Sequence, residues 1–224
     1  MSWLQFAAVI GAFFLTHTIP VKPRVRSKLV GLLGARGFTT AYSALSLVML
    51  SAVIVGAGRA PFVLLWPQAP WQHHIVLLGM FVVCVILAFT LGQPNPFSFG
   101  GAHNERFDPQ HPGIVRWMRH PVLVVLALWA GLHLLPNGDL AHVIVFGIFG
   151  IFAVLGRSLI NRRKRREMTP ARWHALLVQS MAASDFPSGI DLRWVSLRVV
   201  AAVVIYLSLL VFHSLIIGVA VVPL

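Results

Sequence analysis

Six long stretches of this sequence are almost purely apolar, and they restrict the chain to a narrow class of folds. They cover residues 2–20, 38–57, 74–92, 117–136, 140–160 and 196–222. A helix needs roughly 20 mostly apolar residues to cross a bilayer, and a lipid-exposed segment must satisfy its own backbone hydrogen bonds. The pattern therefore predicts an all-α integral membrane protein, a bundle of six transmembrane helices.

The composition agrees with this fold class. Hydrophobic residues make up 58% of the chain and charged residues only 11%, whereas a soluble domain is about half apolar and a quarter charged. The single cysteine, Cys84, excludes an internal disulfide and a cysteine-based metal cluster. The first stretch has no basic segment before it and no cleavage signature near its end, so we expect a retained helix. We expect residues 1–224 to form one transmembrane domain.

The fourth and fifth stretches are expected to form a tight antiparallel hairpin. Only the sequence Pro136-Asn137-Gly138-Asp139 separates them, and these residue types favour turns. The fourth stretch is the shortest, because its apolar run begins at Pro121. It reaches spanning length only if Trp117 and Met118 belong to the helix.

The basic residues predict the orientation of the helices. Every Lys and Arg except Arg59 falls in the loops on one side of the predicted bundle. The positive-inside rule makes these loops cytoplasmic and puts both termini outside. The net charge of +12 therefore reports topology, and we exclude nucleic-acid binding. Residues 161–195 form a basic cytoplasmic segment, helical around Pro170–Met181, which either anchors the last helices or binds anionic lipid head groups.

Four of the ten histidines lie within or at the edge of the apolar stretches. They are His17, His120, His133 and His213. Ionisable groups in a membrane usually face the bundle interior and have a partner. Carboxylates are absent from the stretches, since Asp139 lies in the outer turn and the other five, including Asp185, lie in cytoplasmic segments. Zinc and di-iron sites normally need carboxylate or thiolate ligands as well.

Imidazoles without carboxylates in a helix bundle fit a b-type haem, which two histidines on facing helices can hold. Covalent c-type attachment is excluded, because the sequence has no Cys-x-x-Cys-His. Arginines near the inner surface, among them Arg36, Arg116 and Arg119, can pair with the haem propionates.

Depth in the membrane restricts which histidines can share an iron. His17 and His120 lie near the cytoplasmic side, and His133 lies roughly 20 Å further out along its helix. His213 is also in the outer half. Depth alone favours His17 with His120 and His133 with His213, whereas a His17–His133 pair requires offset or tilted helices.

Several short motifs resemble one family of membrane proteins. They are Thr16-His17-Thr18, Gly34-Ala35-Arg36-Gly37-Phe38, Arg119-His120-Pro121, the run from Leu128 to His142 that contains Trp129-Ala130 and Asn137-Gly138-Asp139, and the C-terminal residues Tyr206, His213 and Leu215–Val219. On these residues nearly the whole chain resembles the NnrU family of bacterial membrane proteins, which includes the 15-cis-zeta-carotene isomerase of plants and cyanobacteria.

The resemblance implies a b-type haem, iron protoporphyrin IX, in the bacterial inner membrane. The isomerase histidines proposed as iron ligands match His17 and His133 here, and His213 stays the alternative partner of His133. The isomerase has a cysteine where this chain has Ala130. Bacterial members of the family are associated with denitrification, through nitrite and nitric oxide reductases. The resemblance thus implies nitrogen-oxide or electron chemistry, or isomerisation of a lipid-soluble substrate, and assigns no catalytic residue.

Two other functions stay open at the level of sequence. Membrane S-adenosylmethionine methyltransferases also carry Arg-His-Pro at the start of a membrane hairpin, as Arg119-His120-Pro121 does here. They also need a carboxylate pair after the hairpin, and this chain offers only Glu167 amid arginines. The other alternative is a structural or regulatory membrane protein without a cofactor, in which the histidines only pack between helices.

Overall fold

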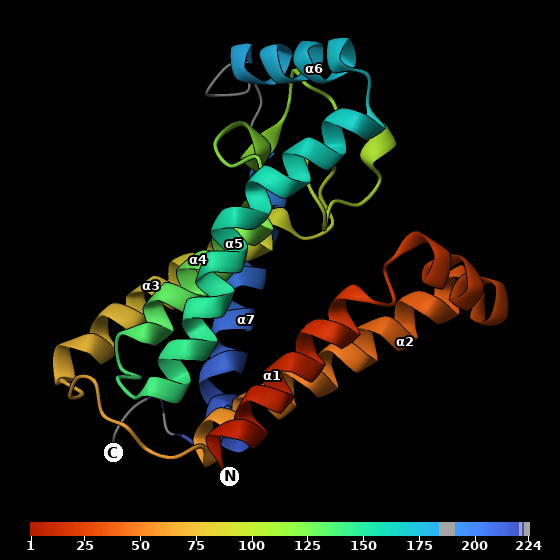
Figure 1. Ribbon diagram of the computed structural model, residues 1–224. Coiled ribbons are helices and arrows are strands. Elements are labelled where there is room, and N and C mark those ends of the chain that lie inside the picture. The colour runs from red at the N-terminus through yellow and green to blue at the C-terminus, as the bar shows by residue number, and fades with distance from the viewer. Residues whose placement is uncertain (184–190, 220, 222–224) are drawn as a thin grey trace. The chain divides into compact units, whose positions relative to one another are not determined.

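The computed structural model describes residues 1–183, 191–219 and 221, and the regular elements among them are all helical (Figure 1). Leu64 and Asp139 also form an isolated β-bridge. The elements are α1 (Trp3–Thr18), α2 (Pro23–Arg59), α3 (Pro70–Thr90), the 3-10 turns η1 (Asn104–Arg106) and η2 (Gly113–Arg116), α4 (Pro121–Leu134), α5 (Leu140–Glu167), α6 (Pro170–Ala182) and α7 (Leu192–Ile217). The all-α class is thus confirmed for the described residues.

The chain groups into two compact units. The first consists of Met1–Pro67 with Gly138–Val145, and the second of Gln68–Asn137 with Phe146–Leu224. Helices α1 and α2 belong to the first unit, α3, α4, α6 and α7 belong to the second, and α5 contributes its first residues to the first unit.

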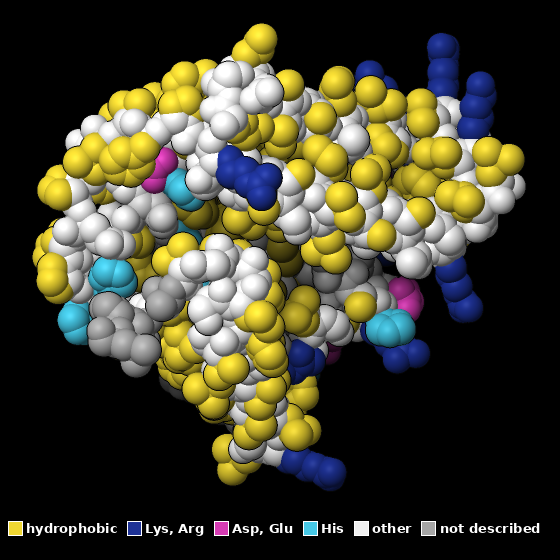
Figure 2. Space-filling model, turned by 90° about the horizontal axis from the view of Figure 1, so that it is seen from below, with side chains coloured by type: hydrophobic (Ala, Val, Ile, Leu, Met, Phe, Trp, Pro, Cys, Tyr) yellow, Lys and Arg dark blue, Asp and Glu magenta, His cyan; other side chains and the backbone are white. Residues whose placement is uncertain are grey.

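The helices have the length and surface of membrane-spanning elements. Four described helices, α2, α3, α5 and α7, are long and apolar enough to cross a bilayer, whereas α1 and α4 are shorter apolar helices. Helix α7 illustrates the surface: Leu215 and Ile216 expose 79% and 73% of their area. Hydrophobic side chains cover much of the visible face in Figure 2. Exposed apolar surface on this scale suits contact with lipid.

In the first unit α1 packs along α2. The side chain of Phe6, only 2% exposed, lies against Gly56, where a Cβ atom would meet the Phe6 ring at 3.5 Å. Small residues such as this glycine let two helices approach closely within a membrane.

Helix α2 is broken at Gly34. This residue has φ 72° and ψ 166°, a conformation that is essentially restricted to glycine. The break is bridged by side chains, because the guanidinium of Arg26 lies 5.5 Å from the ring of Phe38, which in turn stacks on Tyr42. Helix α2 therefore consists of a basic segment before Gly34 and an apolar segment after it.

The predicted second stretch, 38–57, lies entirely within the apolar segment of α2, but the preceding residues are not the loop that the sequence indicated. Residues 23–33 are helical, and Pro23 stands in the first turn, where its fixed φ suits a helix start. The basic residues of this segment interrupt the apolar pattern on which the prediction depended.

The turn before α5 is held by backbone contacts with residues 63–66. Leu65 and Trp66 donate their N–H groups to the carbonyl of Gly138, at 2.7 and 3.2 Å, and Leu140 donates to Val63 at 2.9 Å. A Cβ atom at Gly138 would overlap the carbonyl oxygen of Trp66. Only glycine fits this position without a backbone shift.

In the second unit α3 packs against both α4 and α7. At the α3–α4 contact, a Cβ atom on Gly79 would overlap the end of the Leu132 side chain. Helix α4 also meets α5, since Ala130 lies against Gly150 and Leu123 lies against Gly156.

Helix α4 is shorter than predicted. It begins at Pro121, so the expectation that Trp117 and Met118 belong to it is wrong. The residue before a proline is disfavoured in the helical region, and His120 accordingly has φ −121° and ψ 65°. Trp117 instead follows the short turn η2.

The segment 161–195 contains more helix than predicted. Helix α5 continues to Glu167, and the helix expected around Pro170–Met181 is confirmed as α6. A small core joins α6 to the preceding loops, in which Phe97, Val115 and Trp173 are buried together. Asp185, the rest of 184–190 and residues 220 and 222 of the predicted sixth stretch lie outside the described residues.

Candidate functional site

His17 lies in the last turn of α1 and is held by the helix itself. Its Nδ1 atom is 2.8 Å from the carbonyl oxygen of Phe13, and the Phe13 ring stacks on the imidazole at 4.0 Å. A carbonyl oxygen only accepts hydrogen bonds, so Nδ1 carries the proton and the lone pair is on Nε2. Tyr42 fixes the same turn by donating its hydroxyl to the His17 carbonyl at 3.0 Å.

His133, near the end of α4, repeats this arrangement. Its Nδ1 atom is 2.8 Å from the carbonyl oxygen of Trp129, which again leaves the lone pair on Nε2. The rings of Trp129 and Phe146 lie 5.2 and 5.3 Å from the imidazole, and Trp129 also contacts Phe149. His133 is thus a half-buried imidazole in an aromatic environment.

His213, on α7, has the same proton arrangement through a different contact. Its Nδ1 atom is 2.8 Å from the carbonyl oxygen of Val219, just beyond the helix end at Gly218. His213 and His133 belong to the same unit and lie close enough to interact electrostatically. His17 lies in the first unit, and both pairings, His133 with His17 and His133 with His213, stay predictions.

His120 differs from the other three histidines, because both of its ring nitrogens are engaged. Its side chain is 5% exposed, Nδ1 is 3.0 Å from the Ser98 hydroxyl, and Nε2 is 3.0 Å from Oδ1 of Asn161. The amide oxygen accepts from Nε2–H, and the hydroxyl donates to Nδ1. His120 therefore joins three segments of the second unit and has no lone pair left for a metal in this arrangement.

Two of the three arginines predicted to pair with haem propionates, Arg36 and Arg119, lie in different surroundings. Arg36 is exposed and follows the break at Gly34 by two residues. Arg119 is half-buried, and its guanidinium lies 5.9 Å from the ring of Trp173. Helix α4 separates Arg119 from His133 by about 20 Å, at 1.5 Å per residue.

The position of the isomerase cysteine is closely packed in this protein. Ala130 is completely buried. A Cβ atom on Gly150 of α5 would lie 3.9 Å from its methyl group. Alanine therefore fills the contact between the two helices at the residue three positions before His133.

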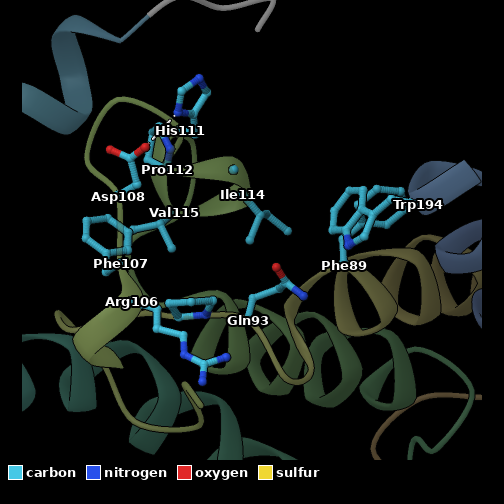
Figure 3. Close-up of a pocket in the computed structure, with 12 residues that line it drawn as sticks. Phe89, Gln93, Arg106, Phe107, Asp108, His111, Pro112, Ile114, Val115 and Trp194 are labelled. Atoms are coloured by element: carbon cyan, nitrogen blue, oxygen red, sulfur yellow. Dashed lines mark hydrogen bonds and ion pairs between the residues drawn. The ribbon is translucent and has the colours of Figure 1, made fainter. Parts of the chain in front are cut away.

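A surface pocket of about 120 Å³, which the sequence did not predict, lies elsewhere in the second unit (Figure 3). Phe89 and Trp194 form one wall, with their rings in an edge-to-face contact at 5.4 Å. Asp108 and His111 lie on the loop that forms the opposite side, and a hydrogen bond from His111 lowers the pKa of the Asp108 carboxyl. The lining residues come from helix ends and loops and share no motif, so no sequence pattern pointed to them.

Among the described residues, no cluster of three or more His, Cys, Asp or Glu side chains could hold a metal ion. On the apolar helices of the described chain, His17, His133 and His213 each direct Nδ1–H to a backbone carbonyl and keep the lone pair on Nε2. His74, in the first turns of α3, makes the same kind of contact with the carbonyl oxygen of Pro70.

Comparison with known proteins agrees with the resemblance of the motifs. A model of the NnrU family, described as NnrU protein, matches residues 5–221 of the 224. No significant match was found among curated proteins or among solved structures. The family match includes the motifs around His17, Ala130, His133 and His213. The chain therefore belongs to the NnrU family.

Proposed function

We propose that this protein binds a b-type haem, iron protoporphyrin IX, through two of the imidazoles of His17, His133 and His213. The observation that carries the proposal is that each of the three donates Nδ1–H to a backbone carbonyl. Histidines that bind metals usually have this second contact, which leaves Nε2 basic and oriented for the metal. The donor set therefore fits a haem iron.

His133 is the first ligand in this proposal. Trp129 and Phe146 lie beside its imidazole and offer the apolar contacts that a porphyrin needs. The family resemblance supports His17 as its partner, and the electrostatic proximity within one unit supports His213. Arg36 is the proposed propionate partner on the His17 side, while the length of α4 makes Arg119 a weaker candidate for a haem bound at His133.

The proposed setting is the bacterial inner membrane, crossed six times by a single domain over residues 1–224, with both termini in the periplasm. At 1.5 Å per residue, the 16 residues of α1 and the 14 of α4 span only about 24 and 21 Å. Local thinning of the bilayer or flanking residues would complete these two crossings. The contacts of Ala130 with Gly150 and Leu123 with Gly156 support an antiparallel α4–α5 hairpin.

The proposed activity is electron or nitrogen-oxide chemistry linked to denitrification enzymes. A haem held by two imidazoles supplies one-electron redox chemistry. Isomerisation of a lipid-soluble substrate is the second candidate, because the family includes a carotene isomerase. The buried Ala130 favours the first, since this chain has no thiol at the position proposed for ligand replacement in the isomerase.

The test is the absorption spectrum of detergent-purified protein from cells with ample haem supply. We expect the bands of a six-coordinate b-type haem in wild type. They should be lost in His133→Ala and in either His17→Ala or His213→Ala, but kept in His120→Ala. Carbon monoxide should leave the spectrum of the reduced protein unchanged in an electron carrier, where both histidines stay bound. It should change that spectrum in an isomerase, in which one coordination position of the iron must become free. Colourless wild-type protein, or equal haem content in all four variants, would refute the proposal.

A further inference from the structure

Trp173 is a buried residue with an unused hydrogen-bond donor. It lies on α6, its side chain is 3% exposed, and its indole Nε1 has no hydrogen-bond partner in the described structure. Buried donors without a partner are uncommon in native proteins and unfavourable. Such a group indicates a hydrogen-bond acceptor that is supplied by a ligand and not by the chain.

Arginines gather around this tryptophan. The guanidinium carbons of Arg119 and Arg165 lie 5.9 and 5.6 Å from the centre of the Trp173 ring. Arg157, two turns before Arg165 on α5, lies close enough to Arg119 for the two charges to repel each other. We call Arg119, Arg157, Arg165 and Trp173 the arginine cluster. All four belong to the second unit.

The arginine cluster has no acidic partner among the described residues. Glu167, the one carboxylate in the sequence Arg162–Glu167, instead pairs with Arg163 at 2.6 Å and with Lys164 at 2.9 Å. Neighbouring positive charges disfavour each other unless an anion lies between them. The aromatic contact with Trp173 stabilises two of the guanidinium groups but does not neutralise them.

We propose that the arginine cluster binds a phosphate group, carried either by an anionic phospholipid or by a free phosphate ion. Guanidinium groups bind phosphate through paired N–H donors, and the indole N–H is a further donor that a phosphate oxygen can accept. The guanidinium groups of Arg119 and Arg165 and the indole N–H offer donors for several phosphate oxygens, and Arg157 adds positive charge near Arg119. The site involves none of the imidazoles proposed to hold haem, and it gives Arg119 a role other than propionate binding.

The experiment follows the indole N–H of Trp173 directly. The full chain, labelled with ¹⁵N-tryptophan, is placed in nanodiscs of phosphatidylcholine alone or with added phosphatidylglycerol, and inorganic phosphate is titrated into the first. The Trp173 signal is identified by its loss in Trp173→Phe. We expect this signal to move when the phosphate is supplied. A response to phosphatidylglycerol alone identifies a lipid head group, and a response to inorganic phosphate identifies a free anion.

Charge-matched variants separate a specific site from general attraction to basic residues. Arg165→Gln should weaken the response by about tenfold, as expected for loss of one charge-assisted contact. Arg157→Gln, which removes a nearby charge without a contact to the Trp173 ring, should weaken it less. Arg163→Gln removes the same charge from the same helix but from a residue paired with Glu167, so its response should stay within about twofold. Arg165→Lys, which keeps the charge, should bind more weakly than wild type.

Two results would overturn the proposal. One is a Trp173 signal that neither the lipid nor the ion moves. The other is an Arg163→Gln variant that weakens the response as much as Arg165→Gln. Because Arg157 and Arg165 are exposed, their substitution should leave the thermal unfolding temperature and any haem spectrum unchanged, which shows that the variants are folded.

Discussion

The Nε2 atom of His120 lies 3.0 Å from Oδ1 of Asn161, and this contact joins the start of α4 to the basic end of α5. Ser98 occupies the other ring nitrogen, also at 3.0 Å. The same residue type thus has two roles in this protein. His120 holds segments together with both nitrogens, while Nδ1 of His17, His133 and His213 contacts a backbone carbonyl and the lone pair is on Nε2.

The structural role of His120 can be measured with a double-mutant cycle. His120→Ala and Asn161→Ala should each lower the thermal unfolding temperature, because each leaves a polar partner without its hydrogen bond. The double variant should show a coupling energy of about 1 kcal/mol, typical of a neutral hydrogen bond. Under the haem proposal, both variants should keep the haem content of wild type. Loss of haem in His120→Ala at an unchanged unfolding temperature would instead make His120 a ligand.

Gly34→Ala tests the break in α2. An L-residue at φ 72° and ψ 166° is strained, so we expect destabilisation of about 1–3 kcal/mol. Gly31→Ala is the matched control, because Gly31 lies in the helical segment with open space around its Cα. That substitution should be neutral or stabilise by up to about 1 kcal/mol. Equal unfolding temperatures for the two variants would contradict a glycine-specific conformation at residue 34.

Gly79→Ala tests the α3–α4 contact. The new methyl group would overlap the end of Leu132, and overpacking of this kind costs roughly 1–3 kcal/mol. Adding Leu132→Ala should recover part of the loss, because it removes the overlapping atoms. Gly131→Ala, one residue earlier on α4 and facing open space, should have little effect. The measurement is thermal unfolding in detergent, and a double variant less stable than the sum of both single losses would argue against this packing.

The pair of Asp108 and His111 predicts a dependence on acid pH. The hydrogen bond from His111, followed by that from the N–H of Gln110, holds the pKa of the Asp108 carboxyl below its usual 3.8. A lowered carboxyl pKa stabilises the folded loop above that usual value, and this contribution is lost as the pH falls through the lowered pKa. Carbon-detected NMR of the Asp108 carboxyl should give a midpoint below 3.8 in wild type and a higher one in His111→Ala.

Much of the fold follows from the apolar pattern, because apolar runs of this length can hardly form anything but membrane-spanning helices. Helix α3 spans 70–90 where 74–92 was expected, and α5 contains the whole of 140–160. The helical segment before Gly34 was missed because its basic residues break the pattern. The sequence places the start of α4 too early, because the apolar Trp117 and Met118 count as helical in that prediction. In the structure Pro121 keeps the preceding His120 out of the helical conformation, and α4 begins at Pro121.

The candidate site was accessible from the sequence only in part. The scarcity of ionisable residues in apolar stretches drew attention to all four histidines, but it could not separate His120 from the others. That distinction depends on Ser98 and Asn161, which lie 22 and 41 residues away along the chain. The arginine cluster is equally hidden in the sequence, since nothing near Trp173 along the chain indicates that Arg119 lies over its ring.

The bonds from the three histidines to backbone carbonyls have a consequence for binding thermodynamics. A free imidazole loses torsional freedom when it coordinates, and that loss opposes complex formation. At His17 and His133 the carbonyl four residues earlier already restricts ring rotation in the folded chain. A planar prosthetic group would therefore bind imidazoles that were already ordered when the helices formed.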